Sequence, residues 1–115
     1  MQPCTGSSST TSTGAGTGKL YAVTGVNAAP DVSTVANLSL APAKDVVSKK
    51  LVANLVACPT LGAPSRETQA NPLLDNYEGM TVVGGPGLAA VSMISDDNFS
   101  ATQFTRVLNL LVKLP

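Results

Sequence analysis

Carboxylates are the side chains in this sequence whose spacing could do chemistry. Four of the seven acidic residues fall in two short motifs, Asp75-Asn76-Tyr77-Glu78-Gly79 and Ser95-Asp96-Asp97-Asn98. No Lys or Arg lies between Arg66 and Arg106 to neutralise them. Carboxylate and amide oxygens are the ligands that hard cations prefer, and carboxylates also serve as general acids and bases.

Each acidic motif is next to an apolar run that is typical of a strand. Met80–Val83 follows the first motif and Leu88–Ile94 precedes the second. The intervening Gly84-Gly85-Pro86-Gly87 has the length and residues of a tight hairpin. Because the start of one hairpin strand and the end of the next lie at the same edge of a sheet, Glu78 and Asp96 are expected to be neighbours. Such a like-charge pair calls for a cation or a shared proton.

Two interpretations of these motifs stay open. In the first, Glu78, Asp96 and Asp97 act as acid/base groups and, together with Asn98, as metal ligands. In the second they are solvated strand ends and turn formers, because Asp and Asn side chains bond their own backbone in turns. A Ser-His-Asp triad is excluded, since the sequence contains no His. The lack of His also makes calcium or magnesium a better candidate ion than zinc.

The composition limits both the core and the kinds of partner. A chain of 115 residues is about one domain, and with 3% aromatic residues its core must come from Val, Leu and Ala. Charged residues make up 12% of the chain, the net charge is zero and there is no basic stripe, so nucleic acid is not an expected partner. No apolar run approaches the roughly 18 residues of a membrane span.

The N-terminal part is rich in Ser, Thr and Gly. Residues 1–18 are predicted to be a flexible, disordered leader, and residues 19–115 the folded domain. The leader lacks the basic and apolar pattern of a signal peptide. Cys4 and Cys58 could pair, but a free, half-buried Cys58 is an equal alternative, so the cysteines do not decide the compartment.

The first half of the domain is predicted to hold short extended segments separated by turns. Residues 20–24 have the pattern of a strand, and an irregular extended piece is expected within 32–40. Residues 46–57 are ambiguous, because apolar residues recur at helical spacing in a run that is also β-branched. Prolines in and around residues 60–72 predict a loop.

The last third predicts three strands, at residues 78–83, 88–95 and 105–114. Apolarity is nearly continuous over Val107–Val112, so the third of these strands is expected to be buried on both faces. A three-stranded antiparallel meander with a fourth strand beside it is the ordinary blade of a propeller.

The two acidic motifs and the segments after them resemble the C-terminal end of the phytase-like ("esterase-like activity of phytase") family. That family has a DN-x-EG motif, a hairpin, and a closing SDDNFS-x-TQ-x-T segment before a last apolar strand. The matching residues here are Asp75-Asn76-Tyr77-Glu78-Gly79-Met80 and Ser95-Asp96-Asp97-Asn98-Phe99-Ser100-Ala101-Thr102-Gln103-Phe104-Thr105. Over residues 73–114 the agreement extends to both identity and spacing. The resemblance also favours a strand for Lys50–Val56.

The resemblance implies an all-β fold. Family members look like β-propellers several times longer than this chain, which would then be a C-terminal piece of about one and a half blades. That piece would be an antiparallel meander, a partial β-propeller that lacks the rest of the ring. A truncated gene model of a full enzyme would have this appearance.

The resemblance also implies a function. By family analogy Glu78, Asp96, Asp97 and Asn98 face the central channel, where acidic groups hold a divalent cation such as calcium and act on a small-molecule ester or phosphoester. A hydrolase in a secreted context is therefore implied, with the isolated piece expected to be inactive. The alternative is a non-catalytic remnant, or an interaction module that pairs its open strand edges and self-associates.

Overall fold

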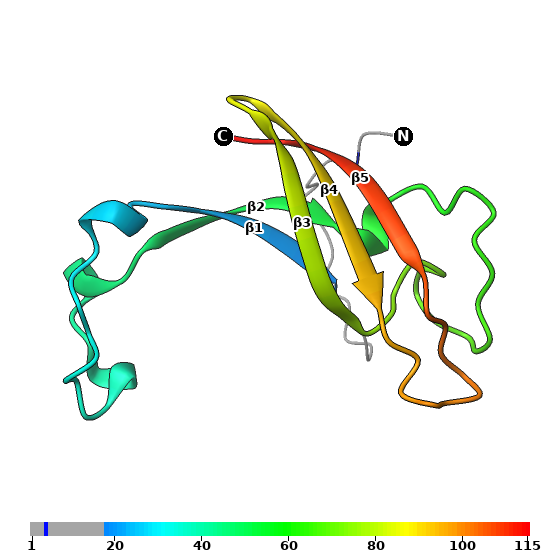
Figure 1. Cartoon of the computed structure of the whole chain (residues 1–115), viewed down its shortest axis with the longest axis horizontal. Coiled ribbons are helices and arrows are strands. Elements are labelled where there is room, and N and C mark those ends of the chain that lie inside the picture. Colours follow the sequence, from blue (N-terminus) through cyan, green and yellow to red (C-terminus); the bar gives the residue numbers. More distant parts are fainter. Residues whose placement is uncertain (1–3, 5–17) are drawn as a thin grey trace.

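The computed structural model of the chain describes Cys4 and residues 18–115, which form an all-β fold (Figure 1). Five strands lie in two antiparallel sheets, which confirms the predicted fold class. The strands are β1 (Lys19–Thr24), β2 (Ser48–Asn54), β3 (Tyr77–Gly85), β4 (Leu88–Ser95) and β5 (Val107–Lys113). Short 3-10 helices are η1 (Val26–Ala28), η2 (Leu38–Leu40), η3 (Ala43–Asp45) and η4 (Leu55–Ala57). No helix among the described residues has the length and apolarity needed to cross a membrane.

The first sheet is a two-stranded ribbon in which β1 pairs with β2. The ribbon resolves the ambiguity of residues 46–57 in favour of a strand, which ends at Asn54 before η4 begins. Asn54 caps that short helix, because its Oδ1 accepts a hydrogen bond from the Val56 N–H (3.3 Å). Cross-strand pairing of the ribbon therefore outweighs the helical spacing of its apolar residues.

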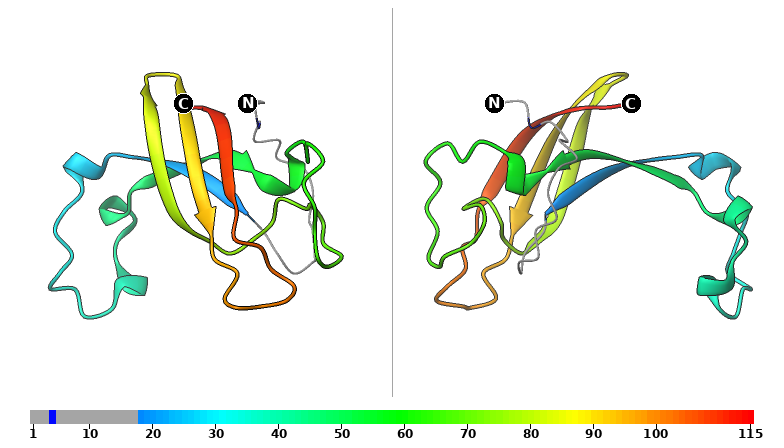
Figure 2. Two further views of the ribbon diagram at one scale, coloured as in Figure 1. Left: turned by 45° about the vertical axis from the view of Figure 1, so that its right-hand side comes forward. Right: turned by 180° about the vertical axis from the view of Figure 1, so that it is seen from behind.

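The connection between β1 and β2, which is described throughout, contains three 3-10 helices and no strand. The extended piece predicted within residues 32–40 is therefore wrong. Asp31 Oδ1 accepts a hydrogen bond from the Ser33 N–H (2.8 Å), and Asn37 Oδ1 accepts one from the Ser39 N–H (3.1 Å). Such local bonds offer the backbone an alternative to a strand ladder. The connection lies at the end of the ribbon away from the second sheet (Figures 1 and 2).

The second sheet is the meander β3-β4-β5 that the sequence predicts. β3 and β4 meet at a two-residue turn, Pro86-Gly87, with Gly85 paired to Leu88. Pro86 has a fixed φ suited to the first turn position, and Gly87, with φ 85°, adopts the left-handed conformation that the second position of a type II turn requires. β5 then pairs along nearly the whole of β4.

The core lies between one face of this sheet and the end of the ribbon nearest to it (Figure 1). Its buried cluster contains no aromatic ring and consists of Cys4, Ala53, Leu55, Cys58, Leu73, Leu74, Val91, Met93, Leu110 and Val112. Buried and exposed residues alternate along β4 and β5, as in a sheet that is covered on one face only. The prediction that β5 is buried on both faces is therefore wrong, and Val107 is 63% exposed.

A disulfide joins Cys4 to Cys58, across 54 residues of sequence. The pair decides between the two alternatives that the sequence leaves open. The Cys4 N–H also donates a hydrogen bond to the Leu111 carbonyl oxygen (3.4 Å) on β5, and Cys4 is 3% exposed. Of the predicted leader, Cys4 and Gly18 are described, while residues 1–3 and 5–17 lie outside the described part.

The second face of the meander is not covered by any described segment. It carries large apolar side chains, each of them 49% or more exposed, which are those of Val83, Leu88, Ile94 and Val107. A polar row of Thr81, Ser92 and Asn109 interrupts them, in which Ser92 Oγ donates a hydrogen bond to Asn109 Oδ1 (2.6 Å). The two antiparallel sheets agree with a meander-based architecture, and the assignment to one and a half propeller blades stays a prediction.

Candidate functional site

The two acidic motifs lie at one end of the β3-β4 hairpin, opposite its turn. The register pairs Tyr77 with Ser95, and the Asp96 N–H donates a 2.9 Å hydrogen bond to the Asn76 carbonyl oxygen. Glu78 is the second residue of β3, and Asp96 directly follows β4. The expectation that Glu78 and Asp96 share one sheet edge is therefore confirmed.

Glu78 lies in a β-bulge, where the register shifts between Tyr77 and Gly79. Its side chain is exposed, and its Oε1 accepts a hydrogen bond from Asn76 Nδ2 at 2.7 Å. Gly79 leaves room for β4, because a Cβ at this position would lie 2.7 Å from Cγ2 of Ile94. Asn76 thus orients the Glu78 carboxylate, and Gly79 permits the close approach of β3 and β4.

Asp96 and Asp97 each use one carboxylate oxygen to shape the loop after β4. Asp96 Oδ1 accepts a hydrogen bond from the Asn98 N–H (3.1 Å), and Asp97 Oδ1 accepts one from the Phe99 N–H (3.0 Å). Asn98 and Phe99 both have left-handed backbone conformations, with φ of 50° and 57°. Asn98 Nδ2 in turn donates to Gln103 Oε1 (3.2 Å) across the loop. The turn-forming interpretation is correct for Oδ1 of both aspartates.

The remaining acid of the first motif, Asp75, belongs to a buried ion pair. Arg106 Nε lies 2.9 Å from Asp75 Oδ2, and the two side chains are 15% and 4% exposed. Arg106 Nη2 also donates to the Pro64 carbonyl oxygen (3.0 Å). The guanidinium of Arg106 is therefore paired with Asp75 and is not free in solvent. This pair is structural, and it ties the start of β5 to the loop that precedes β3.

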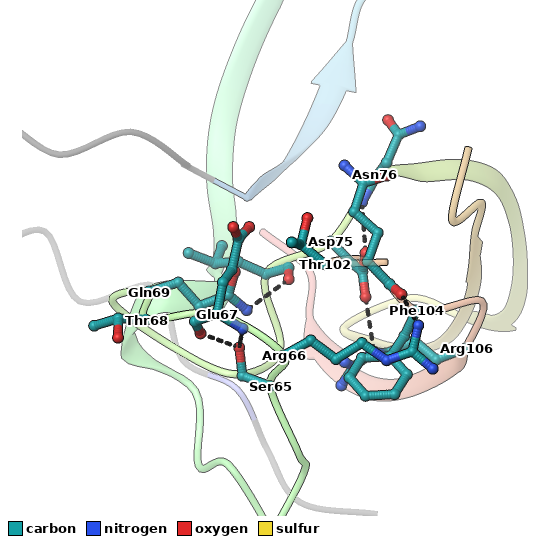
Figure 3. A pocket seen from close by; sticks show the side chains of 12 residues that line it. Ser65, Arg66, Glu67, Thr68, Gln69, Asp75, Asn76, Thr102, Phe104 and Arg106 are labelled. Atoms are coloured by element: carbon teal, nitrogen blue, oxygen red, sulfur yellow. Dashed lines mark hydrogen bonds and ion pairs between the residues drawn. The ribbon is translucent and has the colours of Figure 1, made fainter. Parts of the chain in front are cut away.

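A polar cavity of about 380 Å³ lies beside this end of the sheet (Figure 3). Asp75 and Asn76 contribute to its wall, Gln103 comes from the loop after β4, and residues 65–69 line the other side. Two guanidinium groups lie against the Phe104 ring, that of Arg66 at 4.2 Å and that of Arg106 at 4.9 Å from its centre. Arg66 is exposed, and its Nη1 donates to the Gln103 carbonyl oxygen (2.8 Å).

Sequence reasoning did not assign Arg66 or Phe104 to a site. Arg66 and Arg106 flank residues 67–105, which contain acidic residues and no Lys or Arg. This flanking position is the one sequence signal that could have linked the two arginines. Their meeting on one aromatic ring depends on contacts between residues about 40 positions apart, which no local pattern indicates. Cation–π contacts of this kind contribute about 0.5–1 kcal/mol at exposed positions.

The acidic residues at this end of the hairpin do not form a complete metal site. Within the described part of the chain, no group of three or more His, Cys, Asp and Glu residues is placed to hold a metal. The predicted ligands Glu78, Asp96, Asp97 and Asn98 are at one end of one hairpin, but Asp75 is taken by Arg106. Calcium needs six to eight oxygens, so this edge offers part of a coordination sphere.

A family model described as "Phytase-like: Esterase-like activity of phytase" matches residues 8–99. This chain belongs to the phytase-like family. The match includes strands β1 to β4 and both acidic motifs through Asn98, whereas β5 lies beyond it. No curated protein and no solved structure matches the chain. The family assignment supports a phytase-like or esterase-like domain.

Proposed function

We propose that this chain contributes an acidic, cation-binding edge to a phytase-like hydrolase domain that acts on an ester or phosphoester. Glu78, Asp96, Asp97 and Asn98 are the proposed ligands, and calcium is the proposed ion. The observation that carries this proposal is the 2.9 Å hydrogen bond from the Asp96 N–H to the Asn76 carbonyl oxygen, because it holds the two acidic motifs together.

The bonding of the carboxylates supports a role beyond turn formation. Asp96 and Asp97 each accept one backbone hydrogen bond through Oδ1, and Glu78 accepts one side-chain bond through Oε1. Among the described residues, no hydrogen bond or ion pair reaches the second oxygen of any of the three. The first oxygens therefore orient the carboxylates while the second oxygens stay available to a cation and its waters.

The neighbouring cavity offers a place for the substrate. Asn76 belongs to both features, since it bonds Glu78 and lines the cavity. The exposed guanidinium of Arg66, stacked on Phe104, carries a fixed positive charge that suits an anionic ester or a phosphoester. A bound cation would polarise the reacting oxygen, and a carboxylate of the edge would accept a proton. On its own, the chain is expected to bind without useful turnover.

Calorimetric titration of the full chain with calcium tests the cation site. We expect weak, saturable binding that is lost in Glu78→Gln and Asp96→Asn. Asp31→Asn is the matched control, because Asp31 is an exposed aspartate whose Oδ1 also accepts a backbone bond, at 2.8 Å from the Ser33 N–H. Tighter binding of zinc than of calcium, or equal loss in the Asp31 variant, would contradict the assignment.

Hydrolysis of p-nitrophenyl phosphate and p-nitrophenyl acetate tests the catalytic part. We expect no useful rate from the full chain. Turnover that disappears in Glu78→Gln and persists in Asp31→Asn would show that this chain is catalytically active by itself through the acidic edge. Turnover that neither substitution changes would show that the reaction takes place outside the acidic edge.

One observation favours a second candidate function, an interaction module that works through open strand edges. The outer edge of β3 has no partner strand among the described residues. An unpaired edge presents a row of N–H and C=O groups that can recruit another strand. A module of this kind would self-associate whether or not the acidic edge binds a cation.

A further inference from the structure

We propose that β3 is a self-association strand, which pairs antiparallel with β3 of a second copy of this chain around a two-fold axis near Val82. This inference rests on the second candidate function, for which it names the strand and the partner, and it does not depend on the cation site. The two copies would form a continuous six-stranded sheet in which each contributes β3, β4 and β5.

The edge strands of this fold differ in the features that normally prevent an edge strand from pairing with another chain. β5 has a neighbour along its outer side, since the Cys4 N–H donates to the Leu111 carbonyl oxygen (3.4 Å). β2 carries Lys49 and Lys50, and β1 begins at Lys19. β3 is the terminal strand of its sheet and carries no ionisable side chain from Gly79 to Gly85. Lysines on an edge strand oppose pairing, and β3 has none.

Three apolar side chains of β3 are exposed, and they lie on both faces of the sheet. Met80 is 61% exposed, Val82 is 53% exposed and Val83 is 70% exposed. Met80 and Val82 lie on the same face as the core residues Met93 and Val91, with which they pair. A second β3 beside them would extend this face and remove apolar surface from water at about 25 cal/mol per Å².

The ends of β3 determine the register. A β-bulge interrupts the ladder between Tyr77 and Gly79, and Pro86 follows the strand and has no N–H to donate. The uninterrupted segment therefore runs from Gly79 to Gly85, and its centre is Val82. In an antiparallel pair centred there, Gly79 faces Gly85 of the second copy and Val82 faces its own equivalent.

The same register keeps the charges apart. Glu78 of one copy would lie beside the hairpin turn of the other, at the far end of the pairing strand. The two Glu78 side chains would be separated by about eight residues of strand, or roughly 27 Å, which exceeds the Debye length at physiological salt. Pairing therefore satisfies the open backbone groups and covers apolar side chains without bringing like charges together.

Sedimentation equilibrium of the full chain under oxidising conditions tests this proposal. We expect a monomer–dimer equilibrium with a dimer of twice the 11.6 kDa chain mass. Val82→Lys and Val82→Glu should each raise the dissociation constant at least tenfold, because either substitution places two like charges across the axis. An equimolar mixture of the two variants should recover the dimer, since opposite charges then face each other.

Val107→Lys is the control, because Val107 is an exposed residue of the open sheet face on β5. We expect this variant to dimerise like the unmodified chain. Loss of the dimer in Val107→Lys but not in Val82→Lys would overturn the proposal in favour of face-to-face stacking. A monomer at all concentrations, or a mixture of the two charged variants that does not recover, would also overturn it. Circular dichroism of each variant separates these outcomes from unfolding.

Discussion

Arg106 Nε lies 2.9 Å from Asp75 Oδ2 in the least exposed ion pair of the described residues. The pair takes one acid of the first motif out of the candidate site and gives it a role in holding the fold. Arg106 also bonds the Pro64 carbonyl oxygen, so the two interactions join the loop before β3 to the start of β5. The acidic edge is therefore left with the carboxylates of Glu78, Asp96 and Asp97.

Asp75→Asn is expected to lower the free energy of unfolding by about 3 kcal/mol, because Arg106 would remain buried without a counter-charge. Urea denaturation followed by circular dichroism measures this loss. Asp45→Asn provides the comparison, since Lys44 in the Lys44–Asp45 pair is 80% exposed. That variant should lose less than about 1 kcal/mol. Equal losses in both variants would contradict a structural role for Asp75.

Reduction of the Cys4–Cys58 disulfide is expected to destabilise the chain strongly. The bond closes a loop with a sequence separation of 54, for which the loop-entropy relation predicts about 4 kcal/mol. Thermal unfolding with and without dithiothreitol should therefore show a large fall in Tm. The double variant Cys4→Ser/Cys58→Ser should have the low Tm of the reduced chain, both with and without dithiothreitol. A response of the double variant would show that dithiothreitol acts elsewhere.

The hairpin is expected to tolerate alanine at Gly85 but not at Gly84. A Cβ on Gly84 would lie 2.6 Å from the Leu88 carbonyl oxygen, and Gly84 has φ 154°, whereas a Cβ on Gly85 would meet nothing within 4 Å. Gly84→Ala should cost about 2 kcal/mol or more through backbone strain and overpacking, and Gly85→Ala less than about 1 kcal/mol. Urea midpoints of the two variants decide this, and the reverse order would contradict the described hairpin geometry.

Tyr77 is expected to make stability depend on pH in the alkaline range. Burial raises the pKa of its hydroxyl from 10.0 to about 12, with Arg106 opposing the shift and Asp75 adding to it. The unfolded chain releases this proton first, so stability present below about pH 10 should fall as the pH rises toward 12. Absorbance titration of Tyr21→Phe, which leaves Tyr77 as the remaining tyrosine, measures the pKa. Ionisation at the ordinary value would contradict the burial.

The hairpin and its acidic edge were predictable because their signals are local. Apolar runs on either side of the Gly84-Gly85-Pro86-Gly87 segment predict β3, β4 and the end of the hairpin at which Glu78 and Asp96 lie. The Arg106 partner of Asp75 could not be assigned from the sequence, and the pairing of Cys4 with Cys58 stayed one of two alternatives, because these residues lie 31 and 54 positions apart. The burial of β5 also depended on a distant element, since only the position of the ribbon decides which face of the sheet is covered.

Nuclear magnetic resonance of the uniformly ¹⁵N-labelled chain, titrated with calcium, tests the central claim most directly. We predict saturable shifts of the amide signals of Glu78 and of Asp96–Phe99, while the signals of Asp31 and Ser33 in the matched exposed turn stay in place. Amide signals at the acidic edge that remain unmoved at millimolar calcium, or that move no more than those of Asp31 and Ser33, would contradict it.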